Sequence, residues 1–333
     1  MMRLSQIASL VGSLDGEGRS PIADALAARW GYVSARFRRS SASHVFALAE
    51  ADGEVTAFLR FAPDTHRTAD QLARIAAFVD ALVEHGAPAA RTLRSRAGHW
   101  VETIDTEIGV MHATVTTAAT GEQIDTAALT VVRAHAWGQA LARTHQAATP
   151  YGGSALPAAI DRLTDAMAGA GADRPLASAL GVLLDRLSRL PTDSQRFGIT
   201  HGDFELDNLA WIGDRPSAFD FDEAARSWYV ADIGYAVRDL APVPARTPTA
   251  GEAPLFGALL AGYRQVRPLP EADLYDLPLF ATLHAATDLL RLRPAVDAGA
   301  SPTDPAWLTS LRHRIDNHIQ RLRLAVLRHA DGS

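Results

Sequence analysis

Neither cysteine nor lysine occurs among the 333 residues of the chain. Without cysteine, the chain forms no disulfide and holds no metal through thiolate sulfur. All 32 residues counted as lysine plus arginine are arginine. Any mechanism that requires a lysine amine is therefore excluded.

An excess of positive charge is also missing, because the formal net charge is -6 and the pI is about 6.0. This balance argues against a nucleic-acid binder. No segment approaches about 18 uninterrupted apolar residues, and the N-terminal residues 1–6 lack a secretory apolar run. We therefore expect a cytoplasmic protein without a membrane span. A hydrophobic fraction of 47% is ample for the core of two domains or two lobes.

Apolar periodicity divides the chain into a strand-rich part and a helical part. Two apolar segments, His44–Ala49 and Val55–Phe61, flank an Asp-Gly turn and predict a β-hairpin. Further strands are expected at 91–94, 99–104 and 111–117. Helices are expected within 1–30 and at 68–85, 126–146, 176–190 and 305–329, and two short strands at 209–212 and 217–219. The sequence predicts an α+β fold, with a small antiparallel sheet in residues 1–117 and a mainly helical part in 118–333.

The most informative segment runs from Ile199 to Asn208 and reads Ile-Thr-His-Gly-Asp-Phe-Glu-Leu-Asp-Asn. It places Asp203 and Asn208 five residues apart, and Asp220 follows 12 residues after that asparagine. Such an Asp, Asn and Asp series combines one catalytic base with two metal-binding side chains for phosphoryl transfer. The first hypothesis is therefore a kinase.

Other functions can be assigned to parts of this pattern. Asp220-Phe221-Asp222 is also similar to the nucleophile motif of aspartyl-phosphate phosphatases. Ala224 stands where that motif favours threonine or valine, and its phosphate site needs a lysine that the chain lacks. His201 with Asp203 could form half of a metallohydrolase site, but His284 alone does not supply the second half.

Together, the motifs resemble those of the aminoglycoside phosphotransferase and choline kinase family. His201-Gly202-Asp203 with Asn208 and Asp220 carries the resemblance. Two further segments match, the helix Gly138–His145 with its Gly-x-x-Leu-Ala-x-x-His pattern and the segment Ala231–Gly234. The resemblance covers most of the chain and implies a two-lobed, protein-kinase-like fold. It also implies ATP as phosphoryl donor, with GTP as an alternative, and Mg²⁺ as cofactor.

The resemblance assigns a role to each motif residue. Asp203 would accept or orient the proton of the acceptor hydroxyl, while Asn208 and Asp220 would bind Mg²⁺ through oxygen. His201 and Asp232 would form the scaffold of the catalytic loop. For Asp222 two roles stay open, namely support of the metal shell and capping of the following turn.

The nucleotide-binding side departs from the family pattern. The strand position that usually carries a phosphate-binding lysine falls on Arg60, and Ile75 occupies the place of that lysine's glutamate partner. Acidic residues that could replace this partner in space are Asp70, Glu84 and Glu102. Ser41 lies in a serine-rich turn in place of a glycine-rich loop. Thr117 and Ala119 would offer backbone hydrogen-bonding groups to the adenine ring of the nucleotide.

The hypothesis for function is Mg²⁺-dependent transfer of the ATP γ-phosphoryl group to a hydroxyl of a small molecule. An aminoglycoside, choline-like compound or other amino alcohol is expected, because carboxylates such as Glu205 lie near the motifs. Four aromatic residues could form an acceptor wall or simply core, namely Trp228, Tyr229, Tyr235 and Tyr263. His284 and Asp288 share a helix face that could line the acceptor cleft. The alternative is a kinase-shaped binding or regulatory protein with weak or no turnover. The last helix leaves both a monomer and a homodimer open.

Overall fold

The computed structural model describes residues 1–50, 53–151, 156–168, 173–240, 253–297 and 304–330. The chain divides into two compact units. Unit 1 comprises Met1–Asp80, Ala90–Ala118 and Arg291–Ile319, and unit 2 comprises Ala81–Ala89, Ala119–Leu290 and Gln320–Ser333. The division between residues 117 and 118 stays a prediction, because each unit also draws on other segments of the chain.

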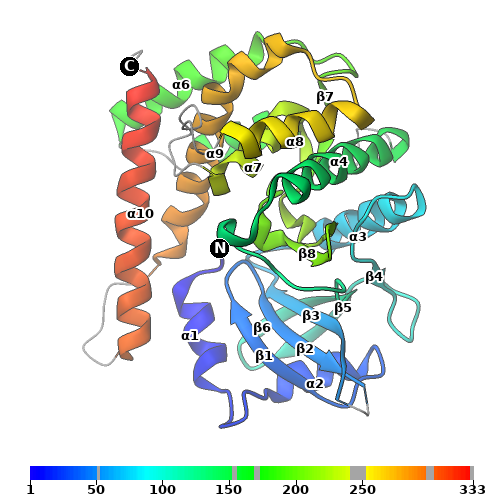
Figure 1. Ribbon diagram of the computed structural model, residues 1–333. Helices are drawn as coiled ribbons and strands as arrows, with labels where there is room; N and C mark the ends of the chain where they lie inside the picture. Colours follow the sequence, from blue (N-terminus) through cyan, green and yellow to red (C-terminus); the bar gives the residue numbers. More distant parts are fainter. Residues whose placement is uncertain (51–52, 152–155, 169–172, 241–252, 298–303, 331–333) are drawn as a thin grey trace. The chain divides into compact units, whose positions relative to one another are not determined.

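Unit 1 is built on a six-stranded antiparallel sheet, blue to cyan in Figure 1. Its strands are β1 (Ala35–Ser40), β2 (His44–Ala49), β3 (Val55–Pro63), β4 (Thr92–Leu93), β5 (Glu102–Thr106) and β6 (Gly109–Thr117). They pair in the order β1-β2-β3-β6-β4, and β5 also pairs with β6. The helical segments of this unit are α1 (Leu4–Gly12), α2 (Pro21–Ala28), most of α3 (Ala69–Glu84), the 3-10 turn η6 (Arg293–Ala295) and the first part of α10 (Ala306–Ala330).

Alternation of side chains along β3 sets the two faces of this sheet. Ala57, Leu59 and Phe61 are buried and join the core that also contains Phe46 of β2. Because successive residues of a strand point to opposite faces, Arg60 lies on the other face, where it is half-buried. The predicted pairing of His44–Ala49 with Val55–Phe61 is confirmed, although residues 51–52 of its turn lie outside the described residues.

Strand β1 was not predicted from the sequence. The segment Arg39–Ser43 was interpreted as a turn, whereas β1 extends to Ser40 and pairs with β2. Within β1, Ala35 is fully buried and the rest of the strand is exposed or half-buried. The strand therefore lacks the apolar alternation on which a sequence-based assignment depends.

Unit 2 is mainly helical, and its described residues also form four short strands in two antiparallel pairs. Its larger helices are α4 (Val131–Ala148), α5 (Ala159–Met167), α6 (Arg174–Ser188), α7 (Tyr229–Leu240), α8 (Ala253–Val266) and most of α9 (Leu277–Leu292). Its strands are β7 (Phe197–Thr200), β8 (Leu209–Ile212), β9 (Arg215–Ala218) and β10 (Ala225–Trp228). The 3-10 turns are η1 (Thr126–Ala128), η2 (Thr149–Tyr151), η3 (Leu206–Asn208), η4 (Phe221–Glu223) and η5 (Glu271–Asp276).

The sheet in the N-terminal part and the helices that follow confirm the predicted α+β class. The hairpin β8-β9 was predicted, but β7 and β10 were not. Helix α4 begins at Val131, later than predicted, because the Thr130 hydroxyl caps it by accepting a hydrogen bond from the Arg133 backbone N–H. Among the described residues, no helix has the length and apolar character needed to cross a membrane.

Helices α4 and α8 lie side by side in Figure 1 and touch through their backbones. A Cβ placed on Gly138 of α4 would lie 1.9 Å from the Leu259 carbonyl oxygen. One placed on Gly262 of α8 would lie 1.9 Å from the carbonyl oxygen of His135. Glycine is therefore required at both positions for this close helix pairing.

Replacing Gly138 with alanine is expected to lower the free energy of unfolding by about 3 kcal/mol, because the two backbones must separate. Gly257, on the same helix α8, is the matched control, since its Cβ would meet no atom within 4 Å. Gly257→Ala should raise stability by about 0.5–1 kcal/mol through helix propensity. Urea unfolding of both variants measures the difference. Equal midpoints for the two variants would contradict the close packing.

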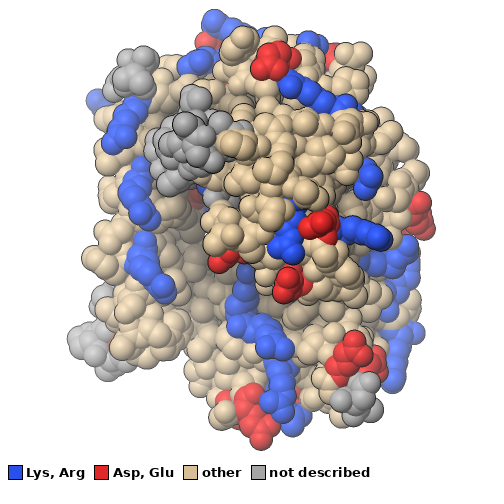
Figure 2. Space-filling view, in the orientation of Figure 1, with Lys and Arg blue, Asp and Glu red and all other residues tan. Residues whose placement is uncertain are grey.

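Acidic and basic side chains are both scattered over the face shown in Figure 2, and every basic residue drawn there is an arginine. The net charge of the chain is thus not concentrated in a single acidic field on the face in view.

Candidate active site

The loop that follows β7 holds the His201-Gly202-Asp203 motif. Strand β7 pairs with β10, and this pairing sets Thr200 opposite Ala225. Beyond the strand, Phe204 and Leu206 are buried, whereas Asp203 and Glu205 remain half-buried. The alternation anchors the loop in the core and keeps its two carboxylates accessible.

The carboxylate of Asp232, on the first turn of α7, holds this loop from the interior. It accepts hydrogen bonds from the backbone N–H groups of His201 and Gly202, each at 2.7 Å. It also accepts one from Nε2 of His145 at 3.0 Å, and the side chain is 1% exposed. Burial alone would raise the pKa of Asp232, but the hydrogen bonds that it accepts from His145 and from the Gly202 backbone hold its pKa below the ordinary value.

The partner His145 is neutral, because burial lowers its pKa despite the nearby Asp232. With Nε2 donating to Asp232, Nδ1 accepts a hydrogen bond from the Tyr263 hydroxyl at 2.9 Å. A chain of buried polar groups from α8, α4 and α7 thus ends on the backbone of the loop. Such a fully paired network fixes one loop conformation.

His201 links the loop to the second motif. Its Nδ1 accepts from the Asp203 backbone N–H at 3.2 Å, so Nε2 carries the proton and donates to the Phe219 carbonyl oxygen at 3.1 Å. Burial lowers the pKa of His201 and keeps this neutral form. Gly202 has φ 83°, and a Cβ there would lie 2.4 Å from the Glu223 carbonyl oxygen, so only glycine fits this turn.

These contacts bring Asp203, Asn208 and Asp220 into one region of unit 2. The Asn208 amide nitrogen donates to the Asp203 carbonyl oxygen at 2.9 Å and to its Oδ2 at 3.1 Å. The backbone carbonyl oxygen of Asn208 in turn accepts a hydrogen bond from the backbone N–H of Phe219, the neighbour of Asp220, at 3.0 Å. Spacing in the sequence thus becomes proximity in space.

The backbone of Asp220 is left-handed, with φ 65° and ψ 60°. Among the described residues, it is the one residue other than glycine with positive φ. This conformation costs about 1 kcal/mol for a residue with a Cβ, and such strain tends to persist at functional sites. The strained backbone distinguishes Asp220 from its neighbours Phe219 and Phe221.

The donor set suits a hard divalent cation. The Asn208 amide nitrogen is committed to Asp203, so its amide oxygen is the atom that a cation can use. A carboxylate and an amide oxygen are ligands that Mg²⁺ prefers, and Mg²⁺ commonly takes only one or two side chains beside water and phosphate. Within the described ranges, no group of three or more His, Asp or Glu side chains is arranged to hold a metal ion.

Asp222 lies in η4, directly after this turn, and is half-buried. Arg162 of α5 fastens the end of η4 by donating to the carbonyl oxygens of Glu223 at 3.1 Å and Ala224 at 2.8 Å. The turn is therefore braced from a second helix. Both roles considered for Asp222 stay predictions.

Arg238, near the end of α7, is a member of the site that the sequence did not reveal. Its Nη2 lies 3.2 Å from Oδ1 of Asp203 and forms a close ion pair with Glu205. Its Nη1 lies 3.5 Å from Oδ2 of Asp288 on α9. Burial alone would lower its pKa, but Tyr235, Glu205 and Asp203 hold the pKa of Arg238 above its ordinary value. No sequence signal distinguishes it from the other arginines.

The predicted nucleotide residues of unit 1 lie on the sheet and its edges. On β3, the Nε of Arg60 donates to the Ser43 hydroxyl at 3.3 Å. Ser41 lies in the turn between β1 and β2, where its backbone N–H donates to the carbonyl oxygen of Ser43. The Thr117 backbone N–H and hydroxyl both bond the backbone of Arg91. The backbone N–H of Thr117 is therefore already used by the sheet.

Glu102 and Ala119 are two more of the residues considered for the nucleotide-binding side. Glu102 accepts a hydrogen bond from Ser95 at 2.5 Å and pairs with His99 and Arg29 at 3.5 and 3.9 Å. Its carboxylate is thus committed to partners other than Arg60. Ala119 begins a segment of unit 2 and is half-buried.

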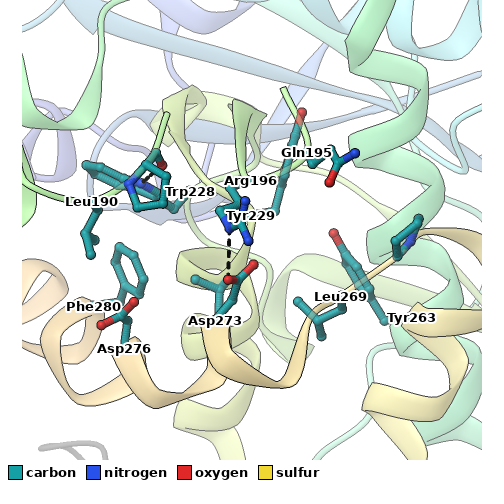
Figure 3. A pocket seen from close by; sticks show the side chains of 13 residues that line it. Leu190, Gln195, Arg196, Trp228, Tyr229, Tyr263, Leu269, Asp273, Asp276 and Phe280 are labelled. Atoms are coloured by element: carbon teal, nitrogen blue, oxygen red, sulfur yellow. Dashed lines mark hydrogen bonds and ion pairs between the residues drawn. The ribbon is translucent and has the colours of Figure 1, made fainter. Parts of the chain in front are cut away.

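Three of the four aromatic residues considered for an acceptor wall surround a cavity of about 30 Å³ (Figure 3). Trp228, Tyr229 and Tyr263 line it, beside the Arg196–Asp273 ion pair at 3.0 Å. Such a cavity has room for one or two water molecules and not for an acceptor. These three rings therefore belong to the core, which was one of the two roles considered for them.

Tyr235 differs from those three aromatic residues. Its ring contacts the ring of His284 with centroids 3.7 Å apart, and the Arg238 guanidinium lies over it at 4.6 Å. His284 and Asp288 on α9 thus share a neighbourhood with Arg238, which connects the predicted helix face to Asp203. Their role toward an acceptor stays a prediction.

Comparison with known proteins gives the family. Residues 34–272, more than half of the chain, match the model of the phosphotransferase enzyme family. The chain is 31% identical over 104 residues to amicoumacin kinase of Bacillus subtilis (strain 168), a match that covers 30% of this chain and 31% of that protein. The match therefore spans about a third of the length of this curated relative.

Solved structures with the same fold extend over nearly the whole chain. An amicoumacin kinase, hAmiN, in complex with AMP-PNP, Ca²⁺ and Ami is 19% identical with TM-score 0.68, covering 95% of this chain and 92% of that one. A microcompartment-associated aminopropanol kinase is 20% identical with TM-score 0.66, covering 93% and 96%. Spectinomycin phosphotransferase in complex with ADP and spectinomycin is 12% identical with TM-score 0.59, covering 94% and 99%.

These likenesses confirm the predicted fold class, and the family match confirms the resemblance read from the motifs. A phosphotransferase was the enzyme class expected from Asp203, Asn208 and Asp220. The chain belongs to the phosphotransferase enzyme family.

Proposed function

We propose that this phosphotransferase moves the γ-phosphoryl group of ATP to a hydroxyl of a small amine-bearing molecule, with Mg²⁺ as cofactor. The observation that carries the proposal is the convergence of Asp203, Asn208 and the Phe219-Asp220 turn through direct hydrogen bonds in unit 2. Family membership gives the reaction class, and this geometry supports the proposed choice of residues.

Each residue of this group has one task. Asp203 hydrogen bonds the acceptor hydroxyl and directs its oxygen toward the γ-phosphorus. The new bond joins that oxygen to phosphorus, the bond to the oxygen bridging the β- and γ-phosphates breaks, and ADP leaves. The hydroxyl proton passes to Asp203 and then to solvent.

The amide oxygen of Asn208 and the carboxylate of Asp220 would hold Mg²⁺, which when bound neutralises charge on the β- and γ-phosphates. The scaffold then maintains the alignment of base and ligands. Asp232 fixes the backbone of His201 and Gly202, and His201 fastens the Asp203 loop to the Phe219 carbonyl. Positioning and electrostatics supply most of the acceleration in this reaction class.

The nucleotide contacts in the proposal are Arg60, Ser41, Thr117 and Ala119. Because the chain has no lysine, Arg60 is the strand residue that would grip phosphate oxygens with its planar, permanently charged guanidinium. Ser41 lies in a turn of small residues that phosphate could approach closely, although its own backbone N–H donates to the Ser43 carbonyl oxygen. ATP is the proposed donor, supported by a relative solved with AMP-PNP, and GTP is the alternative.

An amine-bearing acceptor is supported by two observations. The carboxylates of Asp203, Glu205 and Asp288 all lie around the guanidinium of Arg238. Three carboxylates facing one cation make the region beside Asp203 rich in negative charge. Amicoumacin, aminopropanol and spectinomycin are named with the relatives of similar fold. We place the reaction in the cytoplasm, since ATP is available there. The proposed oligomeric state is a monomer or a homodimer.

The acceptor can be found by measuring ATP consumption against a panel of hydroxylated amines, including 1-amino-2-propanol, choline, spectinomycin and aminoglycosides. Each hit is checked by ³¹P NMR for a new phosphomonoester. Diols and amines without a hydroxyl are the matched negative compounds. An acceptor-dependent phosphomonoester supports the proposal. ATP hydrolysis that no hydroxyl compound stimulates would contradict it.

A further inference from the structure

Both oxygens of the Asp203 carboxylate are held by side chains from different parts of unit 2. Oδ2 accepts from the Asn208 amide at 3.1 Å, and Oδ1 accepts from Nη2 of Arg238 at 3.2 Å. The hydrogen bonds around Asp232 and His201 fix the backbone position of Asp203. They do not themselves fix rotation about the side-chain bonds of Asp203. The two opposed hydrogen bonds remove that freedom.

The Arg238 guanidinium is itself anchored on several sides. Glu205 takes the same Nη2 group in a close ion pair, and Asp288 of α9 lies 3.5 Å from Nη1. The aromatic face of Tyr235, one turn earlier on α7, lies 4.6 Å from the guanidinium carbon. A long side chain that would otherwise sample many rotamers is thus confined to one position.

We propose that Arg238 is a positioning residue for Asp203, and the proposal rests on the proposed function of Asp203 as base. Arg238 acts through the carboxylate, which it keeps aimed at the acceptor hydroxyl. Helix α7 then serves the base twice. Asp232 at its start fixes the backbone of the loop, and Arg238 near its end fixes the side chain.

Arginine suits this task better than lysine would. Its planar fork presents separate N–H groups to Asp203, Glu205 and Asp288, and it stacks on Tyr235 through its flat face. An ammonium group is a compact point charge that cannot reproduce all four contacts. Lysine at this position would keep the charge and lose part of the geometry.

The test compares Arg238→Gln and Arg238→Lys with the wild type, using the acceptor that the panel identifies. For Arg238→Gln we expect kcat to fall by about 10- to 100-fold, the size of effect that a misplaced catalytic group produces. The KM of the acceptor and the Kd of MgATP should stay within about threefold of wild type, because binding is not what Arg238 provides. Arg238→Lys should recover part of the lost kcat.

Arg323→Gln is the matched control for loss of an ion-paired arginine. Arg323 of α10 forms two hydrogen bonds with Asp173, at 2.7 and 2.9 Å, in the same unit and apart from the motifs. This variant should keep kcat within about twofold. Arg238→Gln in an Asp203→Asn background should cause little further loss, because the group that it positions is already gone.

Three results would overturn the proposal. In the first, Arg238→Gln lowers only the melting temperature and keeps kcat, as a purely structural arginine would. In the second, the acceptor KM rises with kcat unchanged, which indicates direct acceptor binding. In the third, the losses from Arg238→Gln and Asp203→Asn multiply fully. If the wild type transfers no phosphoryl group to any acceptor, the proposed function fails instead, so the two failures are distinguishable.

Discussion

Replacing Asp203 with asparagine is expected to lower kcat by about 10²- to 10⁴-fold, the range for loss of a general base. Asparagine keeps the size of the side chain but not its basicity. The contacts that shape the loop through His201 and Asp232 involve backbone groups, so the fold should persist. The Kd of MgATP should stay within about threefold, because Asp203 has no proposed contact with nucleotide.

Steady-state kinetics with the identified acceptor and calorimetry with MgATP measure the two effects separately. Asp214→Asn is the control, since Asp214 lies in the exposed β8-β9 turn and pairs with Arg133 at 3.4 Å. That variant should match the wild type in both measurements. Near-wild-type turnover in Asp203→Asn would show that another group accepts the proton.

Replacing Asp232 with alanine is expected to lower the free energy of unfolding by at least about 3 kcal/mol and to abolish turnover. The change leaves the buried backbone N–H of His201 and the half-buried one of Gly202 without their acceptor, and each unsatisfied buried group costs about 1–3 kcal/mol. The Nε2–H of His145 loses its partner as well. The catalytic loop should then lose its single conformation.

Asp232→Asn should lie between wild type and alanine, because it keeps one acceptor oxygen. Asp173→Ala is the control for loss of an ion-paired carboxylate that also caps a helix, with an expected cost of about 1–2 kcal/mol. Urea unfolding and turnover are measured for all three variants. A urea unfolding curve for Asp232→Ala equal to that of Asp173→Ala would contradict the scaffold role.

The motif residues could be predicted because their geometry is encoded locally. Asp203 and Asn208 are five residues apart in one loop, and their hydrogen bonds follow from the turn that η3 makes. The hairpin of β2 and β3 could also be predicted, since apolar segments flank a glycine turn. In each case the partners are close in sequence.

Arg238 could not be predicted because its partners are distant in sequence. It lies 35 residues from Asp203 and 50 from Asp288, so only the packing of α7 and α9 brings them together. Strands β7 and β10 pair Thr200 with Ala225, so no tight turn joins them as one joins β8 and β9. The left-handed conformation of Asp220 is likewise a product of the assembled site.

The central claim is that Asn208 and Asp220 make nucleotide binding depend on Mg²⁺. Titration calorimetry of ATP with and without Mg²⁺ tests it in the wild type, in Asp220→Ala and in the control Asp214→Ala. In the wild type and the control, we expect ATP binding that requires Mg²⁺. In Asp220→Ala, we expect that addition of Mg²⁺ no longer strengthens ATP binding. Unchanged Mg²⁺-dependent binding in Asp220→Ala would contradict the metal assignment. No binding of ATP or GTP at millimolar concentration would favour a kinase-shaped binding protein instead.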